Sequence, residues 1–137
     1  MSYLLDTNAV SAILKGKPEP LRNRYDSEKS SGGVFKLSVV VYHELYFGAL
    51  RSAKPNISLK RLELLPLEMG EPIEFTPEDA RIAGEIRAKL AQIGRLIGPY
   101  DTLIAAQGLR LRATVVTSNV REFSRVEGLK WEDWAGV

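Results

Sequence analysis

Short apolar runs with strand character alternate with longer helical segments along this chain, and the alternation limits the folds it can adopt. The strand-like runs fall at residues 3–5, 34–39, 73–75, 113–117 and 129–131. The segments between them carry apolar residues at helical spacing, at about 9–15, 20–28, 40–50, 55–65, 77–90 and 100–111. Strands that alternate with helices predict βαβ units on a parallel sheet, so we expect one α/β domain over residues 1–137.

Proline and capping residues mark the ends of these helices. Thr7 and Asn8 are favourable N-caps for the first helix, and Pro66 is expected to close the fourth. Thr76 before Pro77 and two acids predicts the start of the fifth helix. Ligands of an open parallel sheet bind at the carboxyl ends of its strands. Polar residues that follow a strand are therefore the first candidates for a site.

Composition excludes several classes of function. The chain contains no cysteine, which rules out disulfides, thiolate metal sites and a cysteine nucleophile. Its first residues lack the features of a signal peptide, and no apolar run reaches the roughly 18 residues of a membrane span. We therefore expect a cytoplasmic protein without membrane contact. A net charge of +2 is too small to predict nucleic-acid binding by itself, although the basic residues are clustered.

Asp6 directly follows the first strand-like run, where an open α/β fold places its site. A purely structural role is the alternative, because Asp6 could share the capping of the first helix with Thr7 and Asn8. Position alone leaves both roles open.

Glu44 falls among apolar or small residues. Its neighbours three and four positions away on a helix are Val40, Val41, Phe47 and Gly48. Burying an ionised carboxylate without a partner is costly, so a buried Glu44 requires a cation or a metal ion. The alternative is an edge position from which the side chain reaches solvent.

Asp101 lies in the first turn of the last long helix, after Gly98 and Pro99. The helix dipole favours an acid there, which would explain Asp101 without any function. Ile104 and Ala105, however, continue its face towards the core, as the valines do for Glu44. These apolar neighbours favour a functional role for Asp101.

Further polar groups follow the strand at 113–117. Asn119 and Glu122 are candidates for a fourth group of the site, although Asn119 also fits a turn and Glu122 a solvated helix start. Carboxylates gathered at strand ends repel one another, and Mg²⁺ relieves this repulsion because it prefers oxygen ligands. Such a site hydrolyses phosphodiesters without histidine. The only histidine, His43, is rotated about 100° from Glu44 on the helix and is expected to be structural or exposed.

Four motifs occur in a recognisable order and spacing: Asp6-Thr7-Asn8, Glu44–Ala49, Asp101–Ala106 and Thr117–Phe123. Together they resemble the VapC-type PIN-domain toxins of bacterial toxin–antitoxin modules. The resemblance extends from Tyr3 to about Trp134, and four motifs in register make it specific.

This resemblance implies a three-layer α/β/α sandwich on a central parallel sheet. It implies an endoribonuclease that depends on Mg²⁺ or Mn²⁺ and cuts tRNA or other structured RNA. It also implies a homodimer that a cognate antitoxin holds inactive, with operator DNA contacted only through the antitoxin.

Site residues also follow from the resemblance. It implies that Asp6, Glu44 and Asp101 are the catalytic metal ligands. Thr7 and Asn8 would support Asp6, and Thr117 would line the site. Many PIN domains have a fourth acid where this chain has Ser118 or Asn119. We expect Asn119 or Glu122 to take that place as a metal ligand.

Other interpretations remain open at this point. Leu4–Asn8 faintly resembles the nucleophile motif of haloacid-dehalogenase-like phosphatases, although Asn8 stands where that family has a second aspartate. A phospho-receiver domain would need paired acids beside its acceptor, and they are absent from the sequence. The absence of a fourth acid at 118–119 supports a PIN-like scaffold that binds RNA or a partner without cutting.

Overall fold

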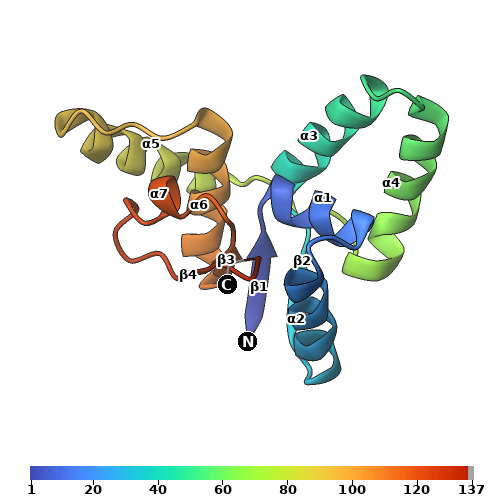
Figure 1. Ribbon diagram of the computed structural model, residues 1–137. Coiled ribbons are helices and arrows are strands. Elements are labelled where there is room, and N and C mark those ends of the chain that lie inside the picture. Colours follow the sequence, from blue (N-terminus) through green and yellow to red (C-terminus); the bar gives the residue numbers. More distant parts are fainter. Residues whose placement is uncertain (136–137) are drawn as a thin grey trace.

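The computed structural model describes residues 1–135 and contains a four-stranded parallel sheet flanked by helices (Figure 1). The strands are β1 (Ser2–Leu5), β2 (Val34–Lys36), β3 (Thr114–Val116) and β4 (Trp131–Glu132), in the order β2-β1-β3-β4. Leu4 lies opposite Val115, and Val115 lies opposite Trp131. The expected α/β class with a parallel sheet is confirmed.

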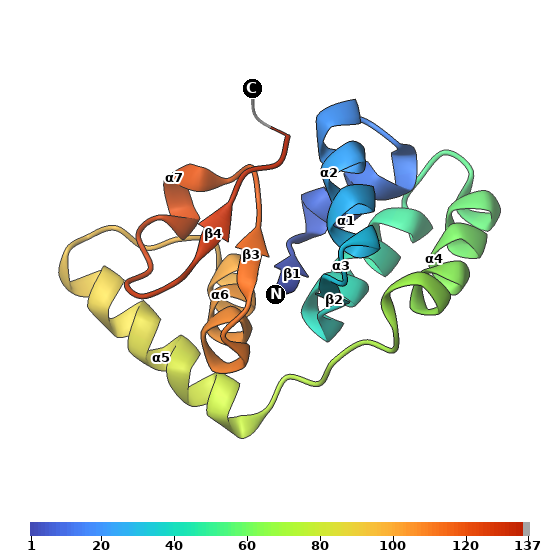
Figure 2. The ribbon, with the colours of Figure 1, turned by 90° about the horizontal axis from the view of Figure 1, so that it is seen from below.

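The helices of the described part form two groups on either side of the central strands (Figure 2). They are α1 (Thr7–Lys15), α2 (Glu19–Ser30), α3 (Val39–Leu50), α4 (Pro55–Met69), α5 (Pro77–Gln92), α6 (Pro99–Leu111) and α7 (Val120–Phe123). Helices α1 to α4 pack against one another near β1 and β2, whereas α5 and α7 contact α6, which packs on β3. The carboxyl end of β1 points towards the region between α1 and α3 on one side and α6 on the other (Figure 1).

The two central strands are buried except for Ser2 at the start of β1. Tyr3, Leu4 and Leu5 of β1 are at most 1% exposed, as are Val115 and Val116 of β3. Parallel strands covered on both faces read as continuous apolar runs, as these do. They give the residues that follow them a rigid support. Within residues 1–135, no helix is both long and apolar enough to cross a membrane.

Several details of the sequence-based prediction differ from the structure. Pro66 does not close α4, which continues to Met69. Leu65 and Met69 are 1% and 5% exposed, so packing of the last turn outweighs the hydrogen bond that proline removes. The expected strand at 34–39 ends at Lys36, because Ser38 already caps α3.

The run at 73–75 forms a single bridge between Ile73 and Ser38 rather than a strand. Pro72 has no amide hydrogen to donate, and Thr76 already caps α5, so the run has no room to pair further. The final edge strand exists, but at Trp131–Glu132 instead of 129–131. The short helix α7 was not predicted.

Candidate metal-dependent active site

Four carboxylates, hereafter the acidic site, gather where the central strands end. They belong to Asp6 after β1, Glu44 in the middle of α3, Asp101 in the first turn of α6, and Glu122 in α7. Burial, together with the negative charges of the other three carboxylates, raises the pKa of Asp101 to about 6. The fold therefore brings together acids that are up to 116 residues apart in sequence.

Asp6 is 4% exposed and is held by two hydrogen bonds. The Ala9 amide donates to Oδ1 at 2.9 Å, which makes Asp6 the N-cap of α1 in place of Thr7 or Asn8. The Thr117 hydroxyl donates to Oδ2 at 2.6 Å. Burial raises the pKa of Asp6 in spite of these hydrogen bonds, and the charge of Glu44 adds to the increase. Asp6 therefore has both of the roles considered for it from the sequence. It caps α1, and it lies in the acidic site.

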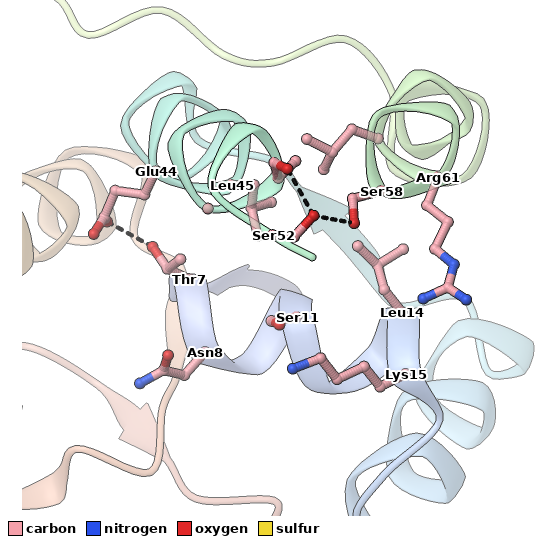
Figure 3. Close-up of a pocket in the computed structure, with 13 residues that line it drawn as sticks. Thr7, Asn8, Ser11, Leu14, Lys15, Glu44, Leu45, Ser52, Ser58 and Arg61 are labelled. Carbon is pink, nitrogen blue, oxygen red and sulfur yellow. Dashed lines mark hydrogen bonds between the residues drawn. The ribbon is translucent and has the colours of Figure 1, made fainter. Parts of the chain in front are cut away.

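Glu44 lies at the boundary between core and solvent. Val40 and Val41 are buried, but Phe47 is 62% exposed, so the apolar stripe expected around Glu44 is buried only on one side. The Thr7 hydroxyl donates to Oε1 of Glu44 at 2.6 Å (Figure 3). Thr7 therefore orients Glu44 and connects α1 to α3.

Asn119 joins Asp101 to Glu122. Its Nδ2 amide donates to Oδ2 of Asp101 and to Oε2 of Glu122, both at 2.9 Å. Hydrogen bonds from Asn119 and from the Gly98 amide hold the pKa of Glu122 below its usual range. A neutral donor thus holds two carboxylates side by side that would otherwise repel each other.

Gly98 leaves space in front of these two carboxylates. A Cβ atom built at this position would lie 3.4 Å from Oε1 of Glu122 and 3.6 Å from Oδ2 of Asp101. Any other residue would therefore fill the gap that a small ligand of these oxygens needs.

The acidic site lacks an ion pair with any lysine or arginine of the described chain. Within residues 1–135, the ion pairs formed by Lys and Arg do not include Asp6, Glu44, Asp101 or Glu122. The positive charge of Arg125 also lowers the pKa of Glu122, but by less than the hydrogen bonds from Asn119 and Gly98 do. Negative charge at the site is therefore left largely uncompensated by the protein.

A divalent cation fits the donor set, which consists of carboxylate oxygens only. Among residues 1–135, no three acids or histidines are close enough to hold one metal ion between them. Mg²⁺ does not require such a cage, because it usually keeps several waters and binds one or two carboxylates. Asp6 and Asp101 fit this role because both are partly or fully buried and both have raised pKa values.

The remaining predicted residues have distinct places. Asn8 is exposed at the rim of a pocket beside Glu44 (Figure 3), and the hydrogen bonds found for the Asp6 carboxylate among the described residues come from Ala9 and Thr117. Support for Asp6 comes instead from Thr117, as expected for a residue that lines the site. His43 is exposed and its ring lies 4.8 Å from that of Tyr100, in agreement with a non-catalytic role.

Sequence reasoning missed one acid near this site. Asp133 directly follows β4, and its negative charge contributes to the raised pKa of Asp6. The Ser118 hydroxyl donates to Asp133 at 3.0 Å. The signal was the same as for Asp6, an acid directly after a strand, but the strand was predicted to end at residue 131 and ends at Glu132.

Comparison with known proteins identifies related molecules. The sequence profile of the PIN domain matches residues 3–129. The chain is 35% identical over 134 residues to the tRNA(fMet)-specific endonuclease VapC of Salmonella typhimurium, with 98% of both proteins covered. It is 33% identical to ribonuclease VapC2 of Haemophilus influenzae, again with 98% of both covered.

Solved structures agree with these sequence matches. VapBC2 of Rickettsia felis, bound to a DNA fragment from its promoter, superimposes with a TM-score of 0.88 at 30% identity and covers 98% of this chain and 99% of its own. DNA-bound VapBC of Salmonella typhimurium gives a TM-score of 0.86 at 35% identity, with 98% of both chains covered. These similarities extend over the whole fold and include all the elements that carry the acidic site.

Proposed function

The chain belongs to the PIN-domain family as a ribonuclease toxin of the VapC type, and we propose that it hydrolyses tRNA at the acidic site. The observation that carries the assignment of the site is a group of partly buried carboxylates that no lysine or arginine of the described chain neutralises. A phosphatase of the haloacid dehalogenase type is excluded by the family match, as is a phospho-receiver domain.

Asp6 and Asp101 would hold Mg²⁺ or Mn²⁺, with Glu44 and Glu122 beside them. A bound divalent cation activates water and neutralises the charge that develops on a phosphate. The protein's own groups supply the orientation: Thr117 and the Ala9 amide fix Asp6, and Thr7 fixes Glu44.

The contacts of Asn119 support this proposal. Its amide donates to both Asp101 and Glu122, so it positions two carboxylates without adding charge. We infer that Glu122 provides the fourth carboxylate and that Asn119 acts as a positioning residue for it. This arrangement weakens the case for a scaffold without catalytic activity.

Transfer RNA is the proposed substrate because the relatives in Salmonella typhimurium and Shigella flexneri are named for cleavage of tRNA(fMet). Both are 35% identical to this chain over nearly its whole length. A protein that acts on tRNA meets its substrate in the cytoplasm, and we place it there.

A cognate antitoxin is the proposed protein partner. Solved relatives are toxin–antitoxin complexes, and three of them are bound to DNA, one of these to a fragment from its promoter. We infer that this chain reaches operator DNA only through its antitoxin, and that the antitoxin keeps it inactive.

The outer face of α3 supports a homodimer. Val39, Phe47 and Leu50 on this face are 39%, 62% and 61% exposed, although the opposite face of α3 is buried in the core. A helix that is apolar on all sides is normally covered on all sides. A second copy would cover this stripe, and Phe47→Glu would then shift the mass measured by light scattering from dimer to monomer. An unchanged dimer mass would exclude this face.

Cleavage of purified tRNA tests the proposed activity. Antitoxin-free protein with Mg²⁺ should give discrete fragments, whereas EDTA and Asp101→Ala should abolish them. Asp26→Ala is a matched control, because Asp26 is an exposed aspartate of α2 that pairs only with Arg22 in the described chain. If neither Mg²⁺ nor Mn²⁺ supports cleavage of tRNA or of total RNA, the chain is a binding scaffold instead.

A further inference from the structure

A pocket of about 310 Å³ extends from the acidic site along the surface between α1, α3 and α4 (Figure 3). Thr7, Asn8 and Glu44 line it at one end. Lys15 and Arg61 line it at the other end. The pocket therefore joins an acidic end to a basic end, and the site described above accounts only for the acidic one.

The two cations have no partner in the described chain. Lys15 is the last residue of α1 and Arg61 lies in the middle of α4, and both are exposed. Neither takes part in any of the ion pairs found among residues 1–135. In Figure 3 the Lys15 side chain runs back along α1 towards Ser11, and the Arg61 side chain extends from α4 beside Leu14. Each therefore offers a cation, free of ion pairs within the described chain, to an anionic ligand that lies along the pocket.

The walls between the two ends are uncharged and combine small residues with Leu14, Leu45 and Leu62. Ser11, Ser52 and Ser58 supply hydroxyl groups, and Gly48 and Ala49 of α3 leave space between them. A Cβ atom at Gly48 would have no atom within 4 Å, so the backbone of α3 is open to close approach there. A polar chain can therefore lie along the pocket without a steric obstacle.

The length of α1 sets the distance between the two ends. Asn8, Ser11 and Lys15 lie on one face of the helix, and seven residues separate the first from the last. At about 1.5 Å per residue, Lys15 is about 10 Å along the axis from Asn8. A stacked nucleic-acid strand advances about 3.4 Å per nucleotide, so this distance spans about three nucleotides.

We propose that Lys15 and Arg61 bind backbone phosphates of the substrate RNA within a few nucleotides of the bond that is cut. The proposal rests on the function proposed above, because it takes the acidic site as the place of cleavage. Lysine binds phosphate as a point charge, and arginine binds it with two parallel hydrogen bonds. The pair would fix the register of the RNA strand relative to the acidic site.

Continuity with the acidic site favours RNA over a protein partner in this pocket. The carboxylates repel a polyanion, so a strand that reaches them needs cations nearby to hold it. Lys15 and Arg61 are placed where the same strand would pass next. An acidic segment of a protein could use the same cations, and the experiment below separates the two occupants.

Binding of fluorescent tRNA tests the proposal in the Asp101→Ala background with Mg²⁺, where the RNA stays intact. Lys15→Gln and Arg61→Gln should each raise the dissociation constant about tenfold, the usual effect of losing one charge-assisted contact. Each should also lower the slope of log affinity against log salt by about one. Lys15→Arg should retain most of the affinity.

Lys17→Gln and Lys60→Gln are matched controls. Both lysines are exposed, both lie within two residues of the tested pair, and neither lines the pocket. They should change the dissociation constant less than twofold. If Lys15→Gln and Arg61→Gln behave like these controls, the proposal is wrong. A copurifying protein partner lost from the same two variants would then identify the pocket as a protein-binding site.

Cleavage by the wild-type protein reports separately on the function proposed above. If wild-type protein cuts tRNA, Lys15→Gln and Arg61→Gln in that background should raise KM and leave kcat unchanged. If wild-type protein does not cut but the tenfold loss of binding is found, the phosphate site stands and only the catalytic role fails.

Discussion

The molecule buries carboxylates in two places, and their pKa values are shifted in opposite directions. At the start of α5, Asp79 is 0% exposed and accepts a hydrogen bond from Nε of Arg110 at 2.5 Å. Burial alone would raise the pKa of Asp79, but Arg110 and the capping interaction with Thr76 bring it below its usual value. At the acidic site, burial and like charges raise the pKa values of Asp6 and Asp101.

The difference separates an acid with a structural role from acids with a functional one. Asp79 has its counter-ion within the chain and fastens α5 to α6. The acidic site contains neutral donors and no cation among residues 1–135, so its charge is left for a ligand to neutralise. An uncompensated cluster is costly for folding, and a chain retains one where binding or catalysis needs it.

Removing Arg110 should have the largest effect on stability. Arg110→Met keeps the aliphatic stem but leaves Asp79 buried without its cation, which should lower the free energy of unfolding by about 3 kcal/mol. Urea denaturation measures this change. Arg121→Met is the control, because Arg121 is exposed in α7 and lies outside the ion pairs of residues 1–135. A loss below about 1 kcal/mol would mean that the Asp79 pair is not structural.

Adding a charge to the acidic site should have the next largest effect. Asn119→Asp replaces the amide that donates to Asp101 and Glu122 by another carboxylate beside them. In EDTA it should lower the free energy of unfolding by about 2 kcal/mol. Mg²⁺ should restore most of this loss. Asn23→Asp, at an exposed position in α2, should change stability little. If Mg²⁺ leaves the destabilisation of Asn119→Asp unchanged, the fourth position does not face the metal.

Removing a charge from the acidic site should instead raise the stability of the protein. Asp101→Asn keeps an oxygen that can accept the hydrogen bond from the Asn119 amide, but it removes the repulsion between Asp101 and the other carboxylates. In EDTA at pH 7.5 it should therefore raise the free energy of unfolding by about 1 kcal/mol, allowing for solvent screening. Asp26→Asn, which breaks an exposed pair with Arg22, should not stabilise. Unfolding by urea would show both. A destabilised Asp101→Asn would indicate that Asp101 is mainly a helix-dipole residue.

The stability of the wild-type protein should depend on pH in the direction set by Asp101. Its pKa of about 6 in the folded state lies above 3.8, the ordinary value for an aspartate in an unfolded chain. The folded state therefore binds a proton first, and stability in EDTA should rise as the pH falls from 7.5 through 6. Asp101→Asn should lack this part of the pH dependence. Parallel curves for the two proteins would exclude Asp101 as its source.

The sequence predicted those features that depend on residues close to one another along the chain. Asp6 after a strand and Asp101 in a first turn were identified because strand ends and helix starts are visible in the pattern of residues. The role of Asp79 was not, because it looks like any acid in the first turn of a capped helix. Its pairing with Arg110, 31 residues away, depends on how α5 packs against α6.

Contacts between distant elements account for the other differences. Thr7 contacts Glu44 across 37 residues, and Asn119 contacts Asp101 across 18, so neither donor could be assigned from its own neighbourhood. Pro66 was expected to end α4 by a local rule, and burial of Leu65 and Met69 overrides that rule. The local sequence predicts candidate groups, and the packing decides which of them meet.

The effect of Mg²⁺ on stability tests most directly whether the acidic site is completed by a divalent cation. Unfolding by urea would be followed at pH 7.5 with increasing MgCl₂, at an ionic strength held constant with KCl, for the wild-type protein and for Asp101→Asn. The wild-type protein should gain about 2.7 kcal/mol when Mg²⁺ reaches a hundred times its dissociation constant, and Asp101→Asn should gain far less. Equal gains in the two proteins, or none in either, would contradict the account.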